Sequence, residues 1–269
     1  MAEQQDIYTH GHHESVLRSH RWRTAENSAA YLIPHLRPGI EVLDIGCGPG
    51  TITLDFARLV APGTVVGVDN VDDPLRIARA EAEASGLANV SFRNADGYRL
   101  PFADDSFDVV HAHQVLQHLT EPVAALREMR RVCRPGGIVA ARDADYGGMR
   151  WSPDVPGLDT WLELYRAVAA SNDAFPDGGR LLKGWARAAG FTDITCTASG
   201  WCFDTPEERA WWGGLWADRI RRSSFADQAL ERGLTTREQL EDLAAAWHAW
   251  IDSPDGWFAV LNGEIVCRA

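Results

Sequence analysis

Apolar residues in the first half of the chain follow two alternating patterns. Short apolar runs bounded by glycine, proline or acidic residues predict buried strands, and longer stretches with apolar residues at helical spacing separate them. The expected strands are 40–45, 64–69, 90–94, 107–112 and 137–143. The expected helices are 14–35, 50–60, 73–86 and 121–133. Strands that alternate with helices form a mostly parallel sheet with helices on both faces, so the pattern predicts an α/β fold.

The pattern changes after residue 145. Two helices are expected at 157–171 and 178–189, followed by a strand at 191–199 and a final strand at 256–267. Between these strands lies a tryptophan-rich stretch, 205–252, with helical spacing throughout; it contains Trp211, Trp212, Trp216, Trp247 and Trp250. These indoles either pack the stretch onto the core or face a binding pocket, and both arrangements are compatible with the pattern.

The first expected strand ends abruptly at the glycine-rich turn Gly46-Cys47-Gly48-Pro49-Gly50. Glycines in a strand–turn–helix unit let the backbone approach a ligand closely, which indicates nucleotide binding. The dinucleotide fingerprint would need a third glycine where Thr51 stands. A carboxylate at Asp44 would also repel a pyrophosphate, whereas a ligand with an amino group would tolerate it. These two residues disfavour a dinucleotide.

The segment Asp44-Ile45-Gly46-Cys47-Gly48-Pro49-Gly50 resembles motif I of the class I S-adenosylmethionine-dependent methyltransferases. Residues 100–110 resemble the L-P-F-x-D-x-x-F-D segment of that family, and residues 131–137 resemble its R-V-L-K-P-G-G turn. The resemblance covers 40–143 and is nearest to the small-molecule branch, with its ubiquinone/menaquinone-type and natural-product enzymes. It implies a Rossmann-like, seven-stranded, mostly parallel sheet with an antiparallel last strand, and S-adenosyl-L-methionine as cofactor.

On this basis the chain divides into five units. Residues 1–35 form a segment and helix that cover the cofactor, and 36–145 form the cofactor-binding core. Residues 146–200 complete the core with a helical insertion, 201–253 form a tryptophan-rich helical lid between the sixth and seventh strands, and 254–269 form the final strand. The lid is expected to cover the pocket of the methyl acceptor.

Candidate cofactor-binding residues follow the expected strands. Asp69 ends the second strand, where an acid can accept two hydrogen bonds from a ribose diol. By resemblance, Asp96 accepts from the adenine amine and Gly97 leaves room for the base. The resemblance adds residues of the glycine turn, the neighbour of Asp69, the end of the fourth strand and the N-terminal segment: Asp44, Gly46, Cys47, Gly48, Asn70, His113, Tyr8 and Arg23.

Methyl transfer needs a base only when the acceptor must lose a proton. His118 with Asp145 as its orienting carboxylate is the preferred candidate dyad, and His113, Tyr146 and Tyr8 are further candidates. Gln114 is neutral where relatives often carry an acid, which argues against a carboxylate base. A carbon nucleophile would need little base. The histidines at 10, 12 and 13 are read as a surface tail rather than a metal site, and no metal is expected.

Composition narrows the partners. A net charge of −12 argues against nucleic acid as a partner. The chain contains no apolar run of 18 residues, so no membrane-spanning segment is expected. Five scattered cysteines without a C-x-x-C pair fit reduced thiols in a cytoplasmic protein. The expected function is methylation of a small organic acceptor, aromatic or apolar, in biosynthesis. An NAD(P)-dependent oxidoreductase and a non-catalytic cofactor-binding subunit stay open as alternative functions, and a homodimer stays open as the oligomeric state.

Overall fold

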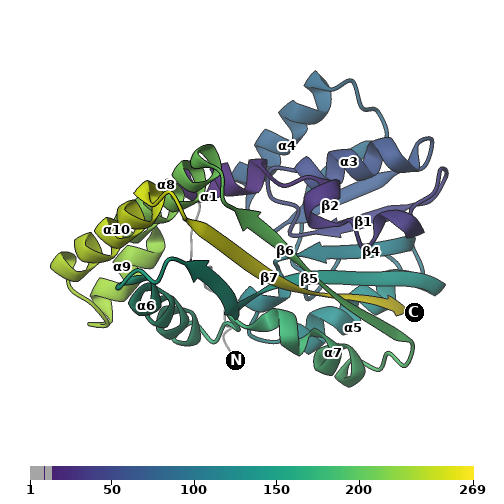
Figure 1. Ribbon diagram of the computed structural model, residues 1–269. Helices are drawn as coiled ribbons and strands as arrows, with labels where there is room; N and C mark the ends of the chain where they lie inside the picture. The colour runs from purple at the N-terminus through teal and green to yellow at the C-terminus, as the bar shows by residue number, and fades with distance from the viewer. Residues whose placement is uncertain (1–8, 10–13) are drawn as a thin grey trace.

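The computed structural model describes Thr9 and residues 14–269, with side chains from Arg18 onward in the second range. Its central feature is a seven-stranded sheet in the order β3-β2-β1-β4-β5-β7-β6 (Figure 1). The strands are β1 (Val42–Ile45), β2 (Val65–Asp69), β3 (Val90–Asn94), β4 (Phe107–His113), β5 (Cys133–Ser152), β6 (Ile194–Phe203) and β7 (Trp257–Arg268). The first five are parallel, and β7 runs antiparallel to both β5 and β6. The predicted fold class is confirmed, including the antiparallel last strand.

Helices cover both faces of the sheet (Figure 1). On one face α5 (Pro122–Val132) and α7 (Gly178–Ala188) pack their apolar sides against the strands. On the other face lie α2 (Ala25–Ser28), the 3-10 turn η1 (Ile33–His35), α3 (Thr51–Val60) and α4 (Asp72–Ala84). The central strands are therefore buried on both sides, which explains their continuous apolar runs. The strand order reverses between β1 and β4, where this class of sheet forms its ligand site.

A helical insertion separates β6 from β7, as expected from the sequence. It consists of α8 (Pro206–Arg222), α9 (Ser224–Glu231) and α10 (Arg237–Asp252). Together with α6 (Leu158–Ala170) these helices lie beyond one end of the sheet (Figure 1). Trp161, Trp247 and Trp250 are fully buried in the apolar cluster that joins them. These three indoles hold the insertion together.

The N-terminal region differs from the single helix predicted over 14–35. It forms α1 (Glu14–Arg21), which packs against α8, and then the chain turns before α2 begins. The new start has a local cause: the Thr24 hydroxyl accepts from the Asn27 amide N–H while the Asn27 side chain accepts from the Thr24 N–H. This reciprocal capping ends one helical run and begins another. The break leaves Trp22 and Arg23 in the connecting turn.

Strand β5 is much longer than the predicted 137–143. It begins at Cys133 and continues to Ser152, with a register irregularity against β7 between Asp145 and Arg150. The glycine pair Gly147-Gly148 falls within this irregularity. Because glycine is unusual inside a strand, the sequence pattern did not predict that β5 continues beyond it. The extension carries Tyr146 and Met149 past the tips of the other parallel strands. Within the described part of the chain, no helix is both long and apolar enough to cross a bilayer.

Candidate functional site

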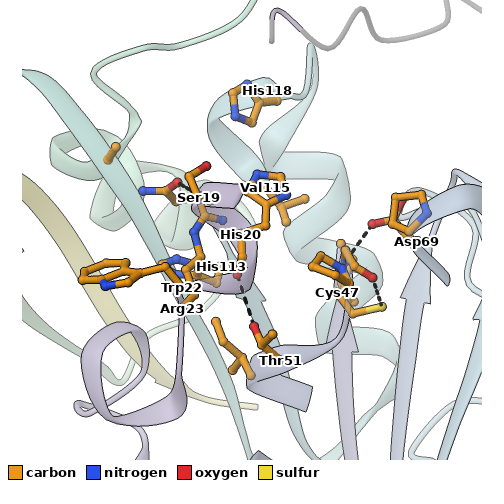
Figure 2. A pocket seen from close by; sticks show the side chains of 18 of the residues that line it. Ser19, His20, Trp22, Arg23, Cys47, Thr51, Asp69, His113, Val115 and His118 are labelled. Carbon is orange, nitrogen blue, oxygen red and sulfur yellow. Dashed lines mark hydrogen bonds between the residues drawn. The ribbon is translucent and has the colours of Figure 1, made fainter. Parts of the chain in front are cut away.

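A cavity of about 340 Å³ lies at the carboxyl ends of the parallel strands. Its walls come from three parts of the chain: α1 and the turn after it, the loops that follow β1 to β4, and the β5 extension with β6, β7 and α8. The volume falls in the range typical of small-molecule sites. Cys47 and Asp69 lie on one side of it and Trp22 and Arg23 on the other (Figure 2).

The glycine turn after β1 forms one wall. Gly46, Gly48 and Gly50 all have positive φ angles, of 63°, 53° and 81°. A Cβ atom at Gly46 would lie 2.3 Å from Val115 Cγ2, whereas one at Gly48 would meet only His20 Nδ1, at 3.7 Å. The first glycine is therefore required by packing against the loop after β4, and the second leaves the backbone open to the cavity. Gly50 differs again, because a Cβ there would lie 2.8 Å from Ala78 Cβ on α4.

Asp69 and Asp96 follow neighbouring strands and both line the cavity. Asp69 Oδ2 accepts from the Gly48 N–H at 3.0 Å and Oδ1 from the Val71 N–H at 3.1 Å. The bond from Gly48 ties the tip of β2 to the glycine turn (Figure 2). Asp96 Oδ1 accepts from the Tyr98 N–H at 2.9 Å, and its side chain is exposed. Asn70 and Gly97 line the same end of the cavity.

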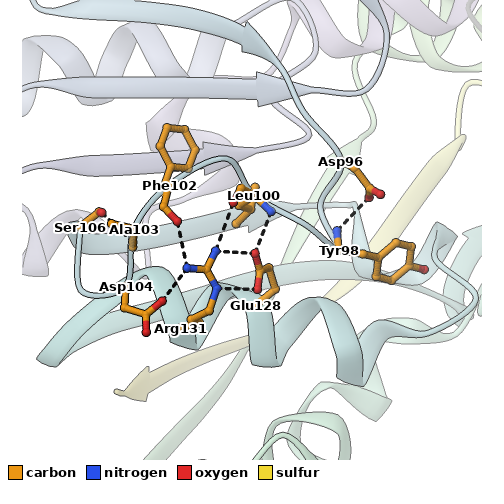
Figure 3. A network of polar contacts seen from close by, with 9 residues as sticks. All are labelled: Asp96, Tyr98, Leu100, Phe102, Ala103, Asp104, Ser106, Glu128 and Arg131. Atoms are coloured by element: carbon orange, nitrogen blue, oxygen red, sulfur yellow. Dashed lines mark hydrogen bonds and ion pairs between the residues drawn. The ribbon is translucent and has the colours of Figure 1, made fainter.

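The loop after Asp96 is held by Arg131 of α5 (Figure 3). This guanidinium donates to the carbonyl oxygens of Phe102 and Leu100, at 2.9 and 3.2 Å, and pairs with Asp104 and Glu128. Hydrogen bonding to Arg131 lowers the pKa of Glu128 and raises that of the guanidinium. The two sequence segments that resembled family motifs thus contact each other, an arrangement that neither segment revealed alone.

Asp44 lines the cavity, yet its carboxylate is held within the protein. It is 3% exposed, accepts from Thr53 Oγ1 at 2.5 Å, and lies 2.8 Å from His111 Nδ1. The acid therefore joins β1 to α3 and β4. Burial, with Asp44 and Asp69 nearby, raises the pKa of the Cys47 thiol well above its usual value, so Cys47 contributes a neutral wall.

His113 lies at the tip of β4 between the two ends of the cavity (Figure 2). The side chain is 6% exposed, and neither ring nitrogen has a hydrogen-bond partner among the described residues. Burial holds the pKa of His113 well below its usual range, and the positive charges of Arg23 and Arg142 add to the effect. The ring is therefore neutral at physiological pH and has a free lone pair beside the cavity.

Gln114 follows in a left-handed conformation, with φ of 53°, that non-glycine residues seldom adopt. Its amide is held from two sides: Arg23 Nη2 donates to Oε1 at 2.6 Å, and Nε2 donates to Asn262 Oδ1 at 3.2 Å. These bonds stabilise the strained backbone and place the Arg23 guanidinium beside the tip of β4. Arg23, expected from the sequence, is thus part of the lining.

The predicted dyad of His118 and Asp145 is wrong. Asp145 does not line the cavity; its carboxylate is 3% exposed and receives Arg180 Nε at 2.6 Å and Nη2 at 2.5 Å. His118 does line the cavity, but its Nε2 lies 3.0 Å from Gln117 Nε2. Gln117 Oε1 accepts from the Ala144 N–H, so the amide nitrogen is the donor and occupies the His118 lone pair.

Burial also lowers the pKa of His118, to about 3, with the charge of Arg23 contributing, so this ring is neutral near physiological pH as well. Of the other base candidates, Tyr146 lines the cavity and stacks on Tyr165 at 4.0 Å between ring centroids. Tyr8 lies outside the described residues. His113 is the remaining histidine of the predicted set with both ring nitrogens available.

Aromatic rings line the end of the cavity away from Asp69: Trp22, Trp201, Trp211, Trp212, Trp216 and Tyr146. The tryptophans therefore have both of the roles that the sequence left open, since some indoles pack the insertion and others line the cavity. Trp22, Trp201 and Arg219 were not among the predicted site residues. Trp201 carries a weak sequence signal as the first aromatic residue of β6, whereas nothing in the sequence singles out Arg219.

Comparisons with known proteins agree with this geometry. A family model described as a methyltransferase domain matches residues 36–190. An uncharacterized methyltransferase of Schizosaccharomyces pombe is 35% identical over 97% of this chain and 96% of its own. Nocamycin O-methyltransferase of Saccharothrix syringae is 29% identical, covering 78% of this chain and 79% of that protein. The solved structure of YcgJ from Bacillus subtilis shares the fold, with a TM-score of 0.60 and 21% identity over 90% of this chain and 98% of its own.

The oxidoreductase alternative is set aside by this family match. A glycine turn with the spacing G-x-G-x-G, a sheet that ends in an antiparallel strand and a family model that covers more than half of the chain lead to the same conclusion. The chain belongs to the methyltransferase family, in the small-molecule branch of the class I S-adenosylmethionine-dependent enzymes.

Proposed function

We propose that this protein transfers a methyl group from S-adenosyl-L-methionine to a small aromatic or apolar acceptor in biosynthetic metabolism. The observation that carries the proposal is one cavity with two chemically different ends: Asp69 and Asp96 with the open backbone at Gly48, and a cluster of aromatic rings. His113 lies between the two ends.

The acidic end fits the adenosyl group. Asp69 is positioned to accept from the ribose hydroxyls, with Asn70 beside it, and Asp96 and Gly97 are positioned for adenine. The open backbone at Gly48 and the field of Asp44 favour the methionine amino group, and Arg23 would hold the carboxylate. Bound there, the cofactor supplies a methyl group on a positively charged sulfur, ready for in-line displacement. We assign Gly46 and Cys47 to shaping the turn.

The protein's own contribution is positioning, exclusion of water and one proton transfer. Trp201, Trp211 and Trp212 supply flat apolar walls for an acceptor, and we infer that α8 and the turn after α1 act as its lid. We assign to His113 the acceptance of the acceptor proton, because the side chain lines the cavity and neither ring nitrogen has a hydrogen-bond partner among the described residues. An acceptor that attacks through carbon would not use this step.

Cofactor binding is tested by calorimetric titration with S-adenosylhomocysteine. Asp69→Ala should weaken binding at least tenfold, since a hydrogen bond to a charged group contributes about 1.5–3 kcal/mol. Asp73→Ala is the matched control, because Asp73 is exposed and does not line the cavity. Asp69→Asn keeps the shape but loses the charge and should fall between them. Equal affinity for Asp69→Ala and Asp73→Ala would refute the assignment.

The role of His113 is tested by turnover. Acceptors are found by screening hydroxylated and aminated aromatics for S-adenosylhomocysteine release. His113→Gln should then lower kcat by about 100-fold or more, the usual effect of a general base, with S-adenosylhomocysteine affinity unchanged. His118→Gln should change kcat little, and kcat of the parent protein should stay flat from pH 8 down to 6. A titration of kcat near pH 6.5, or equal kcat in His113→Gln, would exclude His113 as the base.

The non-catalytic alternative has its own outcome in this screen. A subunit that only binds the cofactor would take up S-adenosylhomocysteine with the Asp69 dependence described above, yet release none from S-adenosylmethionine with any acceptor.

A further inference from the structure

Strand β6 forms one edge of the sheet and is exposed along most of its length. Among the described strands it pairs with β7 alone, in one continuous register over its ten residues. The four consecutive residues 195–198 are all exposed. Because successive side chains of a strand point to opposite faces, neither face of the sheet is covered along this stretch. The edge of β6 is therefore open to solvent.

The hydrogen-bond pattern identifies the groups that face this edge. The Arg268 N–H donates to the Asp193 carbonyl oxygen at 3.0 Å. This pair directly precedes the first register pair of the two strands, Ile194 with Cys267. In an antiparallel ladder such hydrogen-bonded pairs recur at every second residue. The odd-numbered residues of β6 therefore bond to β7, and the even-numbered residues from 194 to 202 direct their N–H and C=O groups to the open edge.

The sequence of β6 lacks the usual protection of an edge strand. Natural edge strands carry lysine, proline or inward-pointing charges, or they are interrupted by a bulge. Residues 194–203 contain no charged residue and no proline, in a chain whose net charge is −12. The register with β7 is continuous, so β6 has no bulge. A long, uncharged edge of this kind favours pairing with a further strand.

The opposite edge of the sheet, β3, is protected. It has only five residues, and one of them, Arg93, is charged. Arg79 Nη2 from α4 also donates to the Phe92 carbonyl oxygen of β3 at 3.1 Å. The sheet thus has one open edge and one blocked edge. Pairing through the open edge ends after two copies, because no second open edge is left to continue the assembly.

Exposed apolar side chains lie beside β6 on one face of the sheet. Leu261 of β7 is 39% exposed, and Trp257 at the start of that strand is 40% exposed. Leu261 pairs with Gly200 of β6. By the two-residue period of a strand, both apolar side chains share a face with the exposed residues Cys196 and Cys202. This face offers apolar surface that a second chain can cover.

We propose that β6 pairs with β6 of a second copy of this chain, antiparallel across a two-fold axis, to form a homodimer with one continuous sheet. A two-fold axis brings the same surface of both copies together, and an antiparallel pair of identical strands has this symmetry. The absence of charge along β6 removes the like-charge repulsion that self-pairing otherwise creates. The inference concerns assembly and does not depend on the proposed function.

The outward-directed residues determine the register. Full overlap of residues 194 to 202 places Ala198 on the axis, opposite its own copy. Even-numbered residues then face even-numbered ones throughout, so Asp193 and Asp204, which flank β6, do not face each other. Cys196 lies diagonally across from Cys202 of the second copy, with about 7–8 Å between the Cα atoms.

Sedimentation equilibrium of the full chain at micromolar concentration measures the assembly, and the parent protein should be a dimer. Ala198→Lys places two lysines opposite each other at the axis and should raise the dimer dissociation constant about tenfold or more. Ser91→Lys is the matched control, because Ser91 is exposed on the opposite edge strand; it should dimerise as tightly as the parent. A monomeric parent, an assembly larger than a dimer, or equal dissociation constants in the two variants would overturn the inference.

Thiol cross-linking provides a second measurement that holds even if Ala198→Lys does not fold. A short bismaleimide should convert the parent into a covalent dimer through Cys196 and Cys202, which are exposed. Replacing both by serine should abolish the covalent dimer and leave the sedimentation unchanged, whereas Cys47→Ser should keep it. No covalent dimer in the parent, or one that persists without Cys196 and Cys202, would contradict pairing through β6.

Discussion

At the scale of single residues, burial keeps three titratable side chains of the cavity wall uncharged. Burial lowers the pKa of His113 and His118 and raises that of Cys47, which leaves each of these groups uncharged near neutral pH. Asp143 of β5 is not part of the cavity lining; it is 1% exposed, and neither of its carboxylate oxygens has a hydrogen-bond partner among the described residues. Burial raises the pKa of Asp143 to about 7, although backbone groups at Gln117 and Val115 and the charge of Arg142 oppose the shift.

Asp143 makes folding stability depend on pH. Its pKa in the folded protein lies above the unfolded value, so the folded state holds the extra proton between about pH 4 and 7, and stability is lost as pH rises through this window. Asp143→Asn removes the titration. The variant should gain stability relative to the parent, and the gain should be about 3 kcal/mol larger at pH 8 than at pH 5, because the two pH units between 5 and the folded pKa of about 7 correspond to about 1.36 kcal/mol each.

Urea unfolding at the two pH values measures this difference. Asp73→Asn, at an exposed position on α4, is the control and should show the same stability relative to the parent at both. A gain for Asp143→Asn that does not change with pH would show that Asp143 is ionised in the folded protein throughout.

At the scale of elements, the glycine turn after β1 is built by contacts as much as by backbone conformation. Gly46 and Gly86 have nearly the same φ, 63° and 65°, but differ in surroundings. A Cβ atom at Gly46 would clash with Val115, while one at Gly86 would meet no atom within 4 Å. Alanine substitution at these two glycines therefore separates the loss of stability caused by a left-handed backbone from the loss caused by a steric contact.

Gly46→Ala and Gly86→Ala should both lose stability from the left-handed conformation, by about 1–2 kcal/mol. Gly46→Ala should lose about 1–3 kcal/mol more from overpacking against Val115. Adding Val115→Ala should recover part of the second loss in Gly46→Ala and none in Gly86→Ala. Denaturant unfolding of the two single and two double variants measures these losses in the free energy of unfolding. Equal losses in the two single variants would contradict the expected clash, because they would mean that Val115 moves aside at no cost.

Element boundaries show where the sequence pattern falls short. The break between α1 and α2 depends on the capping pair Thr24 and Asn27, which lies inside an otherwise helical stretch. The extension of β5 passes through Gly147 and Gly148, which interrupt the apolar alternation while pairing with β7 restores the strand beyond them. Both features place lining residues, Trp22 from the first and Tyr146 and Met149 from the second.

At the scale of the whole molecule, the sheet and its helices were predictable because the signal is local: apolar runs, glycine turns and helical spacing. The strand-tip residues Asp69 and Asp96 were predictable for the same reason. The pairing of Asp145 with Arg180 was not, because it joins residues far apart in sequence and depends on how α7 packs on the sheet. The same applies to Arg219, whose approach to the cavity requires the whole insertion to fold back toward α1.

The division of the tryptophans between two roles also belongs to this scale. Trp161, Trp247 and Trp250 fill the core shared by α6 and the insertion, and Trp211 and Trp212 from α8 line the cavity. One helix therefore has one side in an apolar core and another on the ligand site, so the stability of the insertion and the shape of the acceptor end are linked.

The central claim is that one cavity places an adenosyl group against the strand tips and its sulfur toward His113. A crystal structure with S-adenosylhomocysteine tests this most directly. We expect the ribose hydroxyls at hydrogen-bond distance from Asp69, about 2.7 Å, adenine beside Asp96 and Gly97, and the sulfur facing His113 and the indole cluster. A complex with the ligand elsewhere, or in this cavity with Asp69 unengaged and the sulfur turned away from His113, would contradict the account.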